Sequence, residues 1–214
     1  MNEHPILFSG EMIRAILDGR KTQTRRVMSK KFLARMQIAA MAGEVSFFQE
    51  EGFLEENDLS YLLEFCPYGQ PGDRLWVRET FSINHSMQYS HDHCGTIYRA
   101  SWEGSKDSYG RTFEKERRWR PSIHMPRWAC RILLEVTNIR VERVQDIGKD
   151  PRDAWDEGAT CSCISPVPQC AGNVEAFKKI WDSINAKRGY SWESNPWVWV
   201  IEFKLDIPMM QSTV

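Results

Sequence analysis

Apolar residues recur at helical spacing in two stretches of the chain. The first stretch, 10–18, ends at Gly19, a residue type that commonly terminates helices. The second stretch is 174–185. The apolar stripes consist of Met12, Ile13, Ile16 and Leu17 in the first and of Phe177, Ile180, Trp181 and Ile184 in the second. Both patterns predict amphipathic helices that pack on a core.

Alternating apolar and polar residues predict strands elsewhere. Within 74–81, Leu75 and Val77 alternate with Trp76 and Arg78, directly after a run of turn-forming residues at 66–73. The predicted strands are 5–8, 74–81, 131–144 and 196–205. We expect the last three to share one curved sheet.

Local signals divide the rest of the chain. Asp150 and Pro151 suit the N-cap and first position of a short helix that ends at Gly158. Weaker patterns favour helices at 30–41 and 57–65 and a strand at 95–100, and 159–173 is a loop. No internal repeat or long polar linker is present. We therefore expect one α+β domain spanning 1–214, a twisted β-barrel or half-barrel with flanking helices and insertions near 29–65, 82–120 and 159–173.

The composition is that of a globular protein. The chain has 214 residues, of which 42% are hydrophobic, and its nine tryptophans are ample for a core. Its longest apolar runs, such as Trp197–Ile201, are far shorter than the roughly 20 residues that span a bilayer. The first residues lack the basic and apolar regions of a signal peptide. We therefore expect a cytoplasmic protein without a membrane partner.

Charge is balanced in total but uneven along the chain. The 28 Lys and Arg face 29 Asp and Glu, so the net charge of −1 gives no argument for nucleic-acid binding. The loop 19–26 (GRKTQTRR) nevertheless carries four cations and two hydroxyls. Cations near a helix C-terminus offset the helix dipole for at most about 1 kcal/mol, which accounts for one or two of them. The full cluster favours an anion such as phosphate.

A second basic tract spans 111–131. It has seven cations against two acids, interleaved with Phe113, Trp119 and Trp128. Arginine can meet phosphate while aromatic rings stack on bases, so this composition is typical of binding to single-stranded nucleic acid. Equally, the rings can belong to the core or form cation–π pairs within the fold.

The six cysteines are interpreted as thiols or metal ligands before disulfides, because the expected compartment is reducing. Cys161, Cys163 and Cys170 together with His91, His93 or Cys94 would supply the four ligands of a zinc ion. The spacing is not a standard one, and free thiols in a loop are the alternative. We therefore predict no metal and no cofactor, and zinc binding by this loop stays open.

Four motifs together resemble the ASCH domain, a branch of the PUA-like β-barrel superfamily, and in particular its longer members encoded by phages or prophages. Ile6–Phe8 with the loop 19–26, and Pro71–Glu79, form a specific pair of motifs. Asp153–Gly158 and Trp197–Phe203 are weaker. The resemblance covers most of the chain. It implies a PUA-like barrel whose Lys-Thr-x-Thr loop faces a substrate cleft, with RNA or a modified nucleoside as partner.

One characterised ASCH protein is an amidohydrolase that removes the acetyl group from the exocyclic amine of acetylcytidine. The resemblance places its catalytic lysine, threonine and glutamate on Lys21, Thr24 and Glu157. Lys21, with its pKa lowered by burial and neighbouring arginines, would activate the Thr24 hydroxyl, while Glu157 orients Lys21 or passes the proton to the leaving amine. The alternative is a surface ion pair between Lys21 and Glu157, worth at most about 1 kcal/mol, with Thr24 capping a turn.

Further residues are expected to contact the substrate or nucleic acid. Trp76 and Arg78 share one face of their strand, so Trp76 could stack on a base and Arg78 meet a phosphate. Alternatively, Trp76 belongs to the core and Arg78 pairs with an acid. The expected binding residues are Thr22, Arg25, Arg26, Trp76, Arg78 and Arg127.

Two rival functions are also compatible with the sequence. The tract 111–131 favours a non-catalytic RNA-binding module. The insertions favour a phage accessory protein that binds a host factor.

Overall fold

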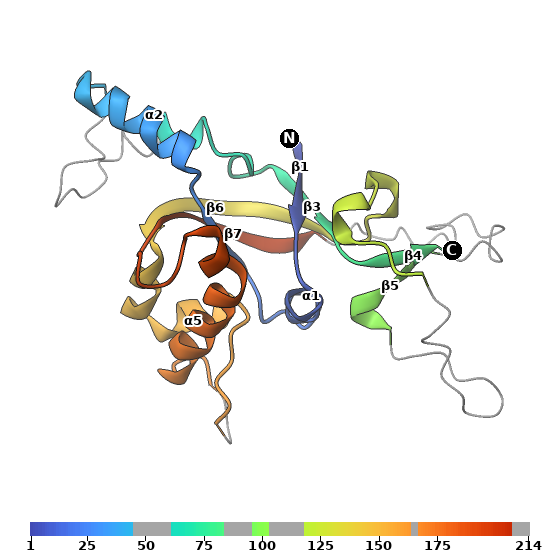
Figure 1. Cartoon of the computed structure of the whole chain (residues 1–214). Helices are drawn as coiled ribbons and strands as arrows, with labels where there is room; N and C mark the ends of the chain where they lie inside the picture. Colours follow the sequence, from blue (N-terminus) through green and yellow to red (C-terminus); the bar gives the residue numbers. More distant parts are fainter. Residues whose placement is uncertain (45–60, 84–95, 103–117, 164–166, 207–214) are drawn as a thin grey trace, which may run out of the picture.

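A five-stranded mixed sheet organises the computed structural model, which describes residues 1–44, 61–83, 96–102, 118–163 and 167–206 (Figure 1). The strand order is β1-β3-β6-β7-β2, in which β1 and β3 are parallel and the other neighbours antiparallel. Because β3, β6 and β7 are neighbours, the prediction that these three segments share a sheet is confirmed. The strands are β1 (Glu3–Leu7), β2 (Gln23–Val27), β3 (Arg74–Arg78), β6 (Leu133–Arg143) and β7 (Trp197–Asp206).

The remaining elements surround this sheet. A short hairpin, β4 (Phe81–Ile83) with β5 (Thr96–Tyr98), forms a second sheet. In Figure 1, β6 and β7 form a long bent ribbon with α1 and α5 below it and α2 above it. The helices are α1 (Gly10–Leu17), α2 (Lys30–Met41), α4 (Pro151–Asp156) and α5 (Gly172–Asn185). Short 3-10 helices are η3 (Arg99–Ser101), η5 (Ser122–His124), η6 (Arg127–Ala129), η7 (Val144–Lys149) and η8 (Ala186–Arg188). Of the predicted helix at 57–65, residues 61–63 are helical and 57–60 lie outside the described residues.

The predicted helix ends are confirmed at α1 and α4. Gly19 follows α1 with a φ of +71°, a conformation that glycine adopts without strain. The Asp150 side chain accepts a hydrogen bond from the Arg152 N–H at the start of α4. Gly158 follows α4 with a φ of +82°, and a Cβ there would lie 3.1 Å from the Cβ of Ala15. The turn after α4 can therefore pack closely against the segment that carries Lys21.

The two faces of β7 belong to two cores. Trp199, Ile201 and Phe203 pack with α1, α2 and the neighbouring strands. Val198 and Val200 pack with α4, η7 and α5. This alternation follows from the two-residue period of a strand. Because of this alternation, β7 separates the first core from the helices near the candidate site.

The α+β class is confirmed, whereas the sheet is not closed into a barrel. The edge strands are β1 and β2, and no backbone ladder joins them among the described residues. A side chain bridges the two instead, because Arg26 Nη2 donates to the Leu7 carbonyl at 2.6 Å. In the part of the chain that the structure covers, no helix combines the length and apolarity that crossing a membrane requires.

Candidate functional site

Lys21 lies inside the protein with only 2% of its surface exposed. Its Nζ donates to the carbonyls of Gln23 and Glu157, both at 2.7 Å, and to Glu157 Oε2 at 2.9 Å. These three acceptors match the three N–H groups of an ammonium. The Lys21–Glu157 ion pair is thus a buried one, with side-chain exposures of 0% and 4%, and not a pair on the surface.

Burial and contacts act on Lys21 in opposite directions. Removal from water lowers the pKa of Lys21, and the Glu157 carboxylate opposes that shift. The effect of burial is the larger of the two. The ammonium is therefore held by its three acceptors but gives up its proton more readily than a lysine in water.

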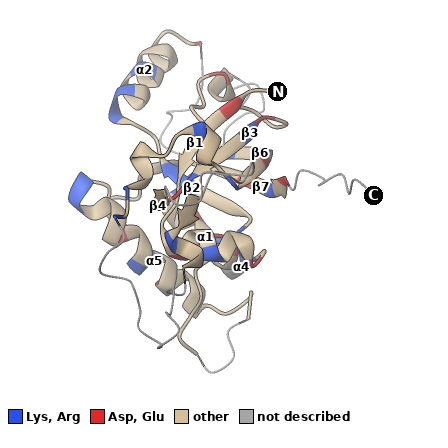
Figure 2. Cartoon of the chain, turned by 90° about the vertical axis from the view of Figure 1, so that its right-hand side faces the viewer, with Lys and Arg blue, Asp and Glu red and all other residues tan. Residues whose placement is uncertain are grey.

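A network of buried and partly buried ion pairs, the ion cluster, extends from Glu157. Arg25 Nη1 lies 3.3 Å from Glu157 Oε1, and Arg25 Nη2 lies 2.9 Å from both Glu142 Oε2 and Asp153 Oδ2. Arg140 joins three carboxylates of the same cluster. Its members are Lys21, Arg25, Arg140, Glu142, Asp153, Glu157 and Glu202, from β2, β6, β7, α4 and the adjoining turns. Figure 2 shows basic and acidic segments beside one another in the middle of the molecule.

A cavity of about 270 Å³ lies next to the ion cluster, between β2 and α5. Thr24, Arg25, Arg26 and Glu157 line it on one side. The apolar stripe of α5 lines it on the other, with Phe177, Ile180, Trp181 and Ile184. The stripe packs on the second core through Phe177 and Trp181, as expected, and it also borders the cavity. The structure thus gathers four of the predicted site residues around one space, which we call the β2–α5 cavity.

Thr24 supplies an aliphatic hydroxyl to this cavity, which Tyr68 also lines. Thr24 is only 3% exposed. Antiparallel pairing of β2 with β7 sets Thr24 opposite Ile201. Thr24 and Glu157 are far apart in sequence, and the packing of α4 beside β2 brings them to the same cavity.

Two arginines of the cavity have no acidic partner. Arg26 lies over the Phe8 ring, 5.0 Å from the centroid, and Arg188 Nη1 lies 3.5 Å from Asn185 Oδ1. Neither forms an ion pair within the described part of the chain, and Arg26 Nε is buried with no hydrogen-bond partner there. Burial chiefly lowers the pKa of Arg26, and the charge of Arg188 adds to this. Tyr68 and Glu157 partly oppose the effect of burial on the pKa of Arg26. Two cations that form no ion pair among the described residues favour an anionic or carbonyl-rich ligand.

The other predicted binding residues do not line this cavity. Thr22 is exposed, and its backbone is used in hydrogen bonds to Asp156 and Phe203. Trp76 packs against the small core of Phe81, Met125, Ala129 and Cys130. Arg78 donates a hydrogen bond to the Ile123 carbonyl, and its guanidinium lies 5.3 Å from the ring centroid of Trp76. Arg127 donates two hydrogen bonds to Glu3, at 2.7 and 2.9 Å.

In the described part of the second basic tract, two arginines, Arg127 and Arg131, form ion pairs with acids of the fold. Arg131 forms two bonds of 2.8 and 2.9 Å to Glu79, a carboxylate that is 2% exposed. The Arg99 guanidinium lies 5.2 Å from the ring centroid of Trp119. Trp128 differs, because it is 54% exposed. Residues 111–117, including Phe113, lie outside the described residues.

Sequence reasoning missed Tyr68 and Arg188 as cavity residues. Tyr68 belongs to the predicted turn at 66–73, and nothing local marks it as part of a site. Arg188 is the last residue of η8, which follows α5, and it precedes Gly189, which has a φ of +82°. A basic residue at a helix end suggests only a dipole contact. Their roles depend on contacts between distant segments.

Three cysteine sulfurs form a further group of potential ligands. The Sγ atoms of Cys161, Cys163 and Cys170 lie within 4.8 Å of one another, and Cys161 and Cys163 form a disulfide. This pairing differs from the expected free thiols. The proposed partners His91, His93 and Cys94 lie outside the described residues.

No protein-family model, curated protein or solved structure matches this chain. The resemblance of the sequence motifs to ASCH domains therefore stays a prediction.

Proposed function

We propose that this protein is a PUA-like ASCH protein that binds a modified nucleoside in the β2–α5 cavity and hydrolyses the amide on the exocyclic amine of acetylated cytidine. The observation that carries the proposal is the convergence of Thr24 and Glu157 on one cavity, with Lys21 Nζ 2.9 Å from the Glu157 carboxylate. The motif resemblance assigns the same three residues to catalysis.

The size and lining of the cavity favour a nucleoside over a polymer. Small-molecule sites are concave, mostly apolar and supplied with a few polar groups. About 270 Å³ suits a nucleoside-sized ligand. Tyr68 and Trp181 offer aromatic surface for a base, and Arg26 and Arg188 offer donors for a carbonyl, a ribose or a phosphate.

The residues can be assigned to the steps of amide hydrolysis. The Thr24 oxygen forms a bond to the acyl carbon as its proton passes to the Glu157 carboxylate. The C–N bond then breaks, and the same proton goes to the departing exocyclic amine. Water hydrolyses the resulting threonine ester, releases a carboxylic acid and restores the hydroxyl. Arg26 stabilises the oxyanion, because its guanidinium lines the cavity and forms no ion pair with any described residue.

Lys21 acts through Glu157 in this scheme. All three of its N–H groups already have acceptors, so it is not free to take the Thr24 proton directly. The sequence assigned Lys21 as the base, and the contacts favour Glu157 for that step. Lys21 positions the glutamate through the 2.9 Å contact between Lys21 Nζ and Glu157 Oε2.

The test is turnover of N4-acetylcytidine by the purified protein, followed by release of cytidine. Thr24→Ala removes the nucleophile, and Thr24→Ser restores a hydroxyl. We expect activity in the wild type, a loss of about 100-fold or more with Thr24→Ala, and partial recovery with Thr24→Ser. Thr137→Ala is a matched control, because Thr137 is exposed on β6 and does not line the cavity.

Two outcomes would overturn the catalytic assignment. Turnover that Thr24→Ala leaves unchanged would exclude Thr24 as nucleophile. Binding of N4-acetylcytidine without any turnover would favour the non-catalytic module.

A further inference from the structure

Three sulfur atoms meet where the loop after α4 returns to the start of α5. Cys161 Sγ lies 3.2 Å from Cys170 Sγ, and Cys163 Sγ lies 3.8 Å from it. Cys161 and Cys163 are joined by a disulfide, and Cys170 is a free thiol. We call this group the sulfur cluster. None of its three cysteines lines the β2–α5 cavity.

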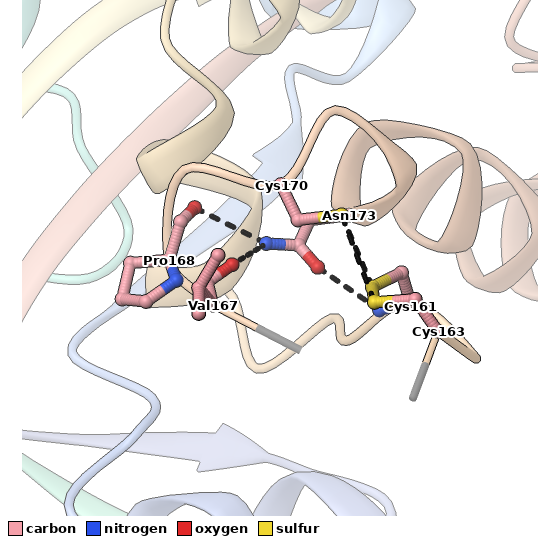
Figure 3. The surroundings of a disulfide bond; sticks show 6 residues. All are labelled: Cys161, Cys163, Val167, Pro168, Cys170 and Asn173. Carbon is pink, nitrogen blue, oxygen red and sulfur yellow. Dashed lines mark hydrogen bonds between the residues drawn. A yellow bond between two sulfur atoms is a disulfide. The ribbon is translucent and has the colours of Figure 1, made fainter. Parts of the chain in front are cut away.

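Asn173 fixes the two chain segments that carry the cluster (Figure 3). This asparagine is fully buried. Its side-chain oxygen accepts from the Cys161 N–H at 2.9 Å, and its Nδ2 donates to the carbonyls of Val167 and Pro168 at 2.9 and 3.1 Å. A buried amide with its bonds satisfied rigidifies the groups that it joins. The hydrogen bonds of Asn173 thus hold the cysteine-bearing segments together independently of any bond between the sulfurs.

Gly172 permits the close approach of the two segments. A Cβ at this position would lie 2.8 Å from the Cβ of Cys161 and 3.6 Å from Cys170 Sγ. Any side chain larger than hydrogen would push Cys161 away from Cys170. The absence of a side chain at Gly172 therefore lets Cys161 and Cys170 lie close together.

We propose that the sulfur cluster, once its disulfide is reduced, binds a divalent thiophilic metal ion such as Zn²⁺ through the thiolates of Cys161, Cys163 and Cys170. A structural disulfide needs two sulfurs and leaves the third unexplained. The disulfide also encloses a single residue, Ser162, and a short closed loop removes less entropy from the unfolded chain than a long one. Tetrahedral zinc with Zn–S bonds of about 2.3 Å places its sulfurs about 3.8 Å apart, close to the Cys163–Cys170 separation.

The fourth metal position faces a cavity of about 620 Å³. All three cysteines line this cavity, and Glu175 of α5 lines it as well. Among the described residues, no fourth ligand atom lies as close to the three sulfurs as they lie to one another. We assign the fourth position to water, with Glu175 as its hydrogen-bond partner. A metal with three protein ligands and one water has an exchangeable site.

A dithiol reductant can convert the Cys161–Cys163 disulfide into the thiols that the metal site requires. The dithiol transfers two electrons and two protons to the Cys161–Cys163 disulfide and becomes a disulfide itself. The three resulting thiols then release three protons as they bind the metal ion. In the oxidised sulfur cluster only Cys170 can supply a thiolate, so this form is expected to bind the ion far more weakly.

Cobalt titration of the full chain tests this directly. The protein is reduced with a dithiol, transferred to anaerobic buffer and titrated with Co²⁺, whose thiolate charge-transfer bands report sulfur ligation. We expect about one ion per chain in the reduced protein, its displacement by Zn²⁺, and almost no binding by the oxidised protein. Cys170→Ser should abolish the thiolate bands or weaken binding by about 100-fold or more, and Ser162→Ala is the matched control within the same loop.

The outcomes separate the proposal from its rivals. Binding that survives Cys170→Ser and Cys163→Ser would place the metal elsewhere and overturn the site. Thiol–disulfide exchange of Cys170 with no metal uptake by the reduced protein would also overturn it, in favour of a redox group of three thiols. Circular dichroism of Cys170→Ser shows whether the variant is folded. Glu175→Gln should keep the thiolate bands, because the glutamate contacts only the water.

Discussion

The two arginine-rich segments of this chain have similar compositions, but their arginines have different partners in the structure. In β2, Arg25 belongs to the buried ion cluster and Arg26 faces the β2–α5 cavity without an acidic partner. In the second tract, Arg127 and Arg131 pair with Glu3 and Glu79 outside that cavity. Local charge therefore does not locate a site. What distinguishes the two segments is whether distant parts of the chain supply carboxylates for every cation.

The largest expected contrast between the two segments is in stability. Glu157→Gln removes the charge that faces the buried Lys21 and Arg25, and breaking such a pair costs about 3 kcal/mol or more. Arg127→Ala breaks a partly exposed pair with Glu3, for which at most about 1 kcal/mol is expected. Urea unfolding of both variants measures the difference in the free energy of unfolding. Equal losses would mean that the ion cluster is no more important to the fold than a surface pair.

Titration provides a second contrast. Burial raises the pKa of Tyr98 to about 12 from its ordinary value of 10.0. Because the folded protein prefers the neutral phenol, its stabilising effect is present below pH 10 and is lost as the pH rises from 10 to about 12. The side chain is partly open to solvent, so the loss is on the order of 1 kcal/mol.

The difference between wild type and Tyr98→Phe in unfolding free energy, measured across this range, isolates the effect of Tyr98. Lys21 has the opposite sign, because burial lowers its pKa and its contribution rises with pH as the unfolded chain loses the proton. A difference between wild type and Tyr98→Phe that does not change with pH would contradict the assignment to Tyr98.

A third comparison tests whether Arg26 and Arg188 make the β2–α5 cavity prefer an anionic ligand. Cytidine 5′-monophosphate should bind about tenfold more tightly than cytidine at low salt, because a charge-assisted bond contributes about 1.5 kcal/mol or more. Arg188→Ala should remove this preference. Lys187→Ala is the matched control, because the neighbouring Lys187 is exposed and does not line the cavity. Equal effects of both variants in calorimetry would indicate general charge attraction.

The smallest effect is expected for RNA binding by the second tract. Each phosphate that is neutralised on a single strand contributes about 0.7 to the slope of log K against log salt. Because Arg127 and Arg131 already pair with carboxylates, Arg127→Ala and Arg131→Ala should leave the slope for a single-stranded RNA unchanged. Fluorescence anisotropy over a range of salt concentrations measures it. A slope that becomes shallower by about 0.7 in either variant would restore the tract as a phosphate-binding surface.

The elements that could be predicted from sequence are those with local signals. The apolar stripe and Gly19 defined α1, the Asp150 cap defined the start of α4, and alternation defined β6 and β7. The motif resemblance combines Lys21, Thr24 and Glu157 in one hypothesis. In the structure Lys21 contacts Glu157, and Thr24 and Glu157 line the same cavity.

The residues that could not be predicted depend on long-range partners. Nothing near Arg127 or Arg131 in sequence announces Glu3 or Glu79 as the acids that neutralise them. The β2–α5 cavity likewise exists because the apolar stripe of α5 does not fully close on β2. Hydrophobic periodicity gives the face that a helix buries but not the space that is left beside it.

The most direct test of the central claim sets the β2–α5 cavity against the second tract in one binding experiment. Ile184→Trp adds a ring beside the cavity at a residue that is 45% exposed, and Trp128→Ala removes the exposed ring of the tract. Calorimetric titration with N4-acetylcytidine should show binding to the wild type, a loss of about tenfold or more with Ile184→Trp, and no change with Trp128→Ala. A loss of about tenfold with Trp128→Ala, together with unchanged binding by Ile184→Trp, would contradict the account and place the nucleoside on the tract.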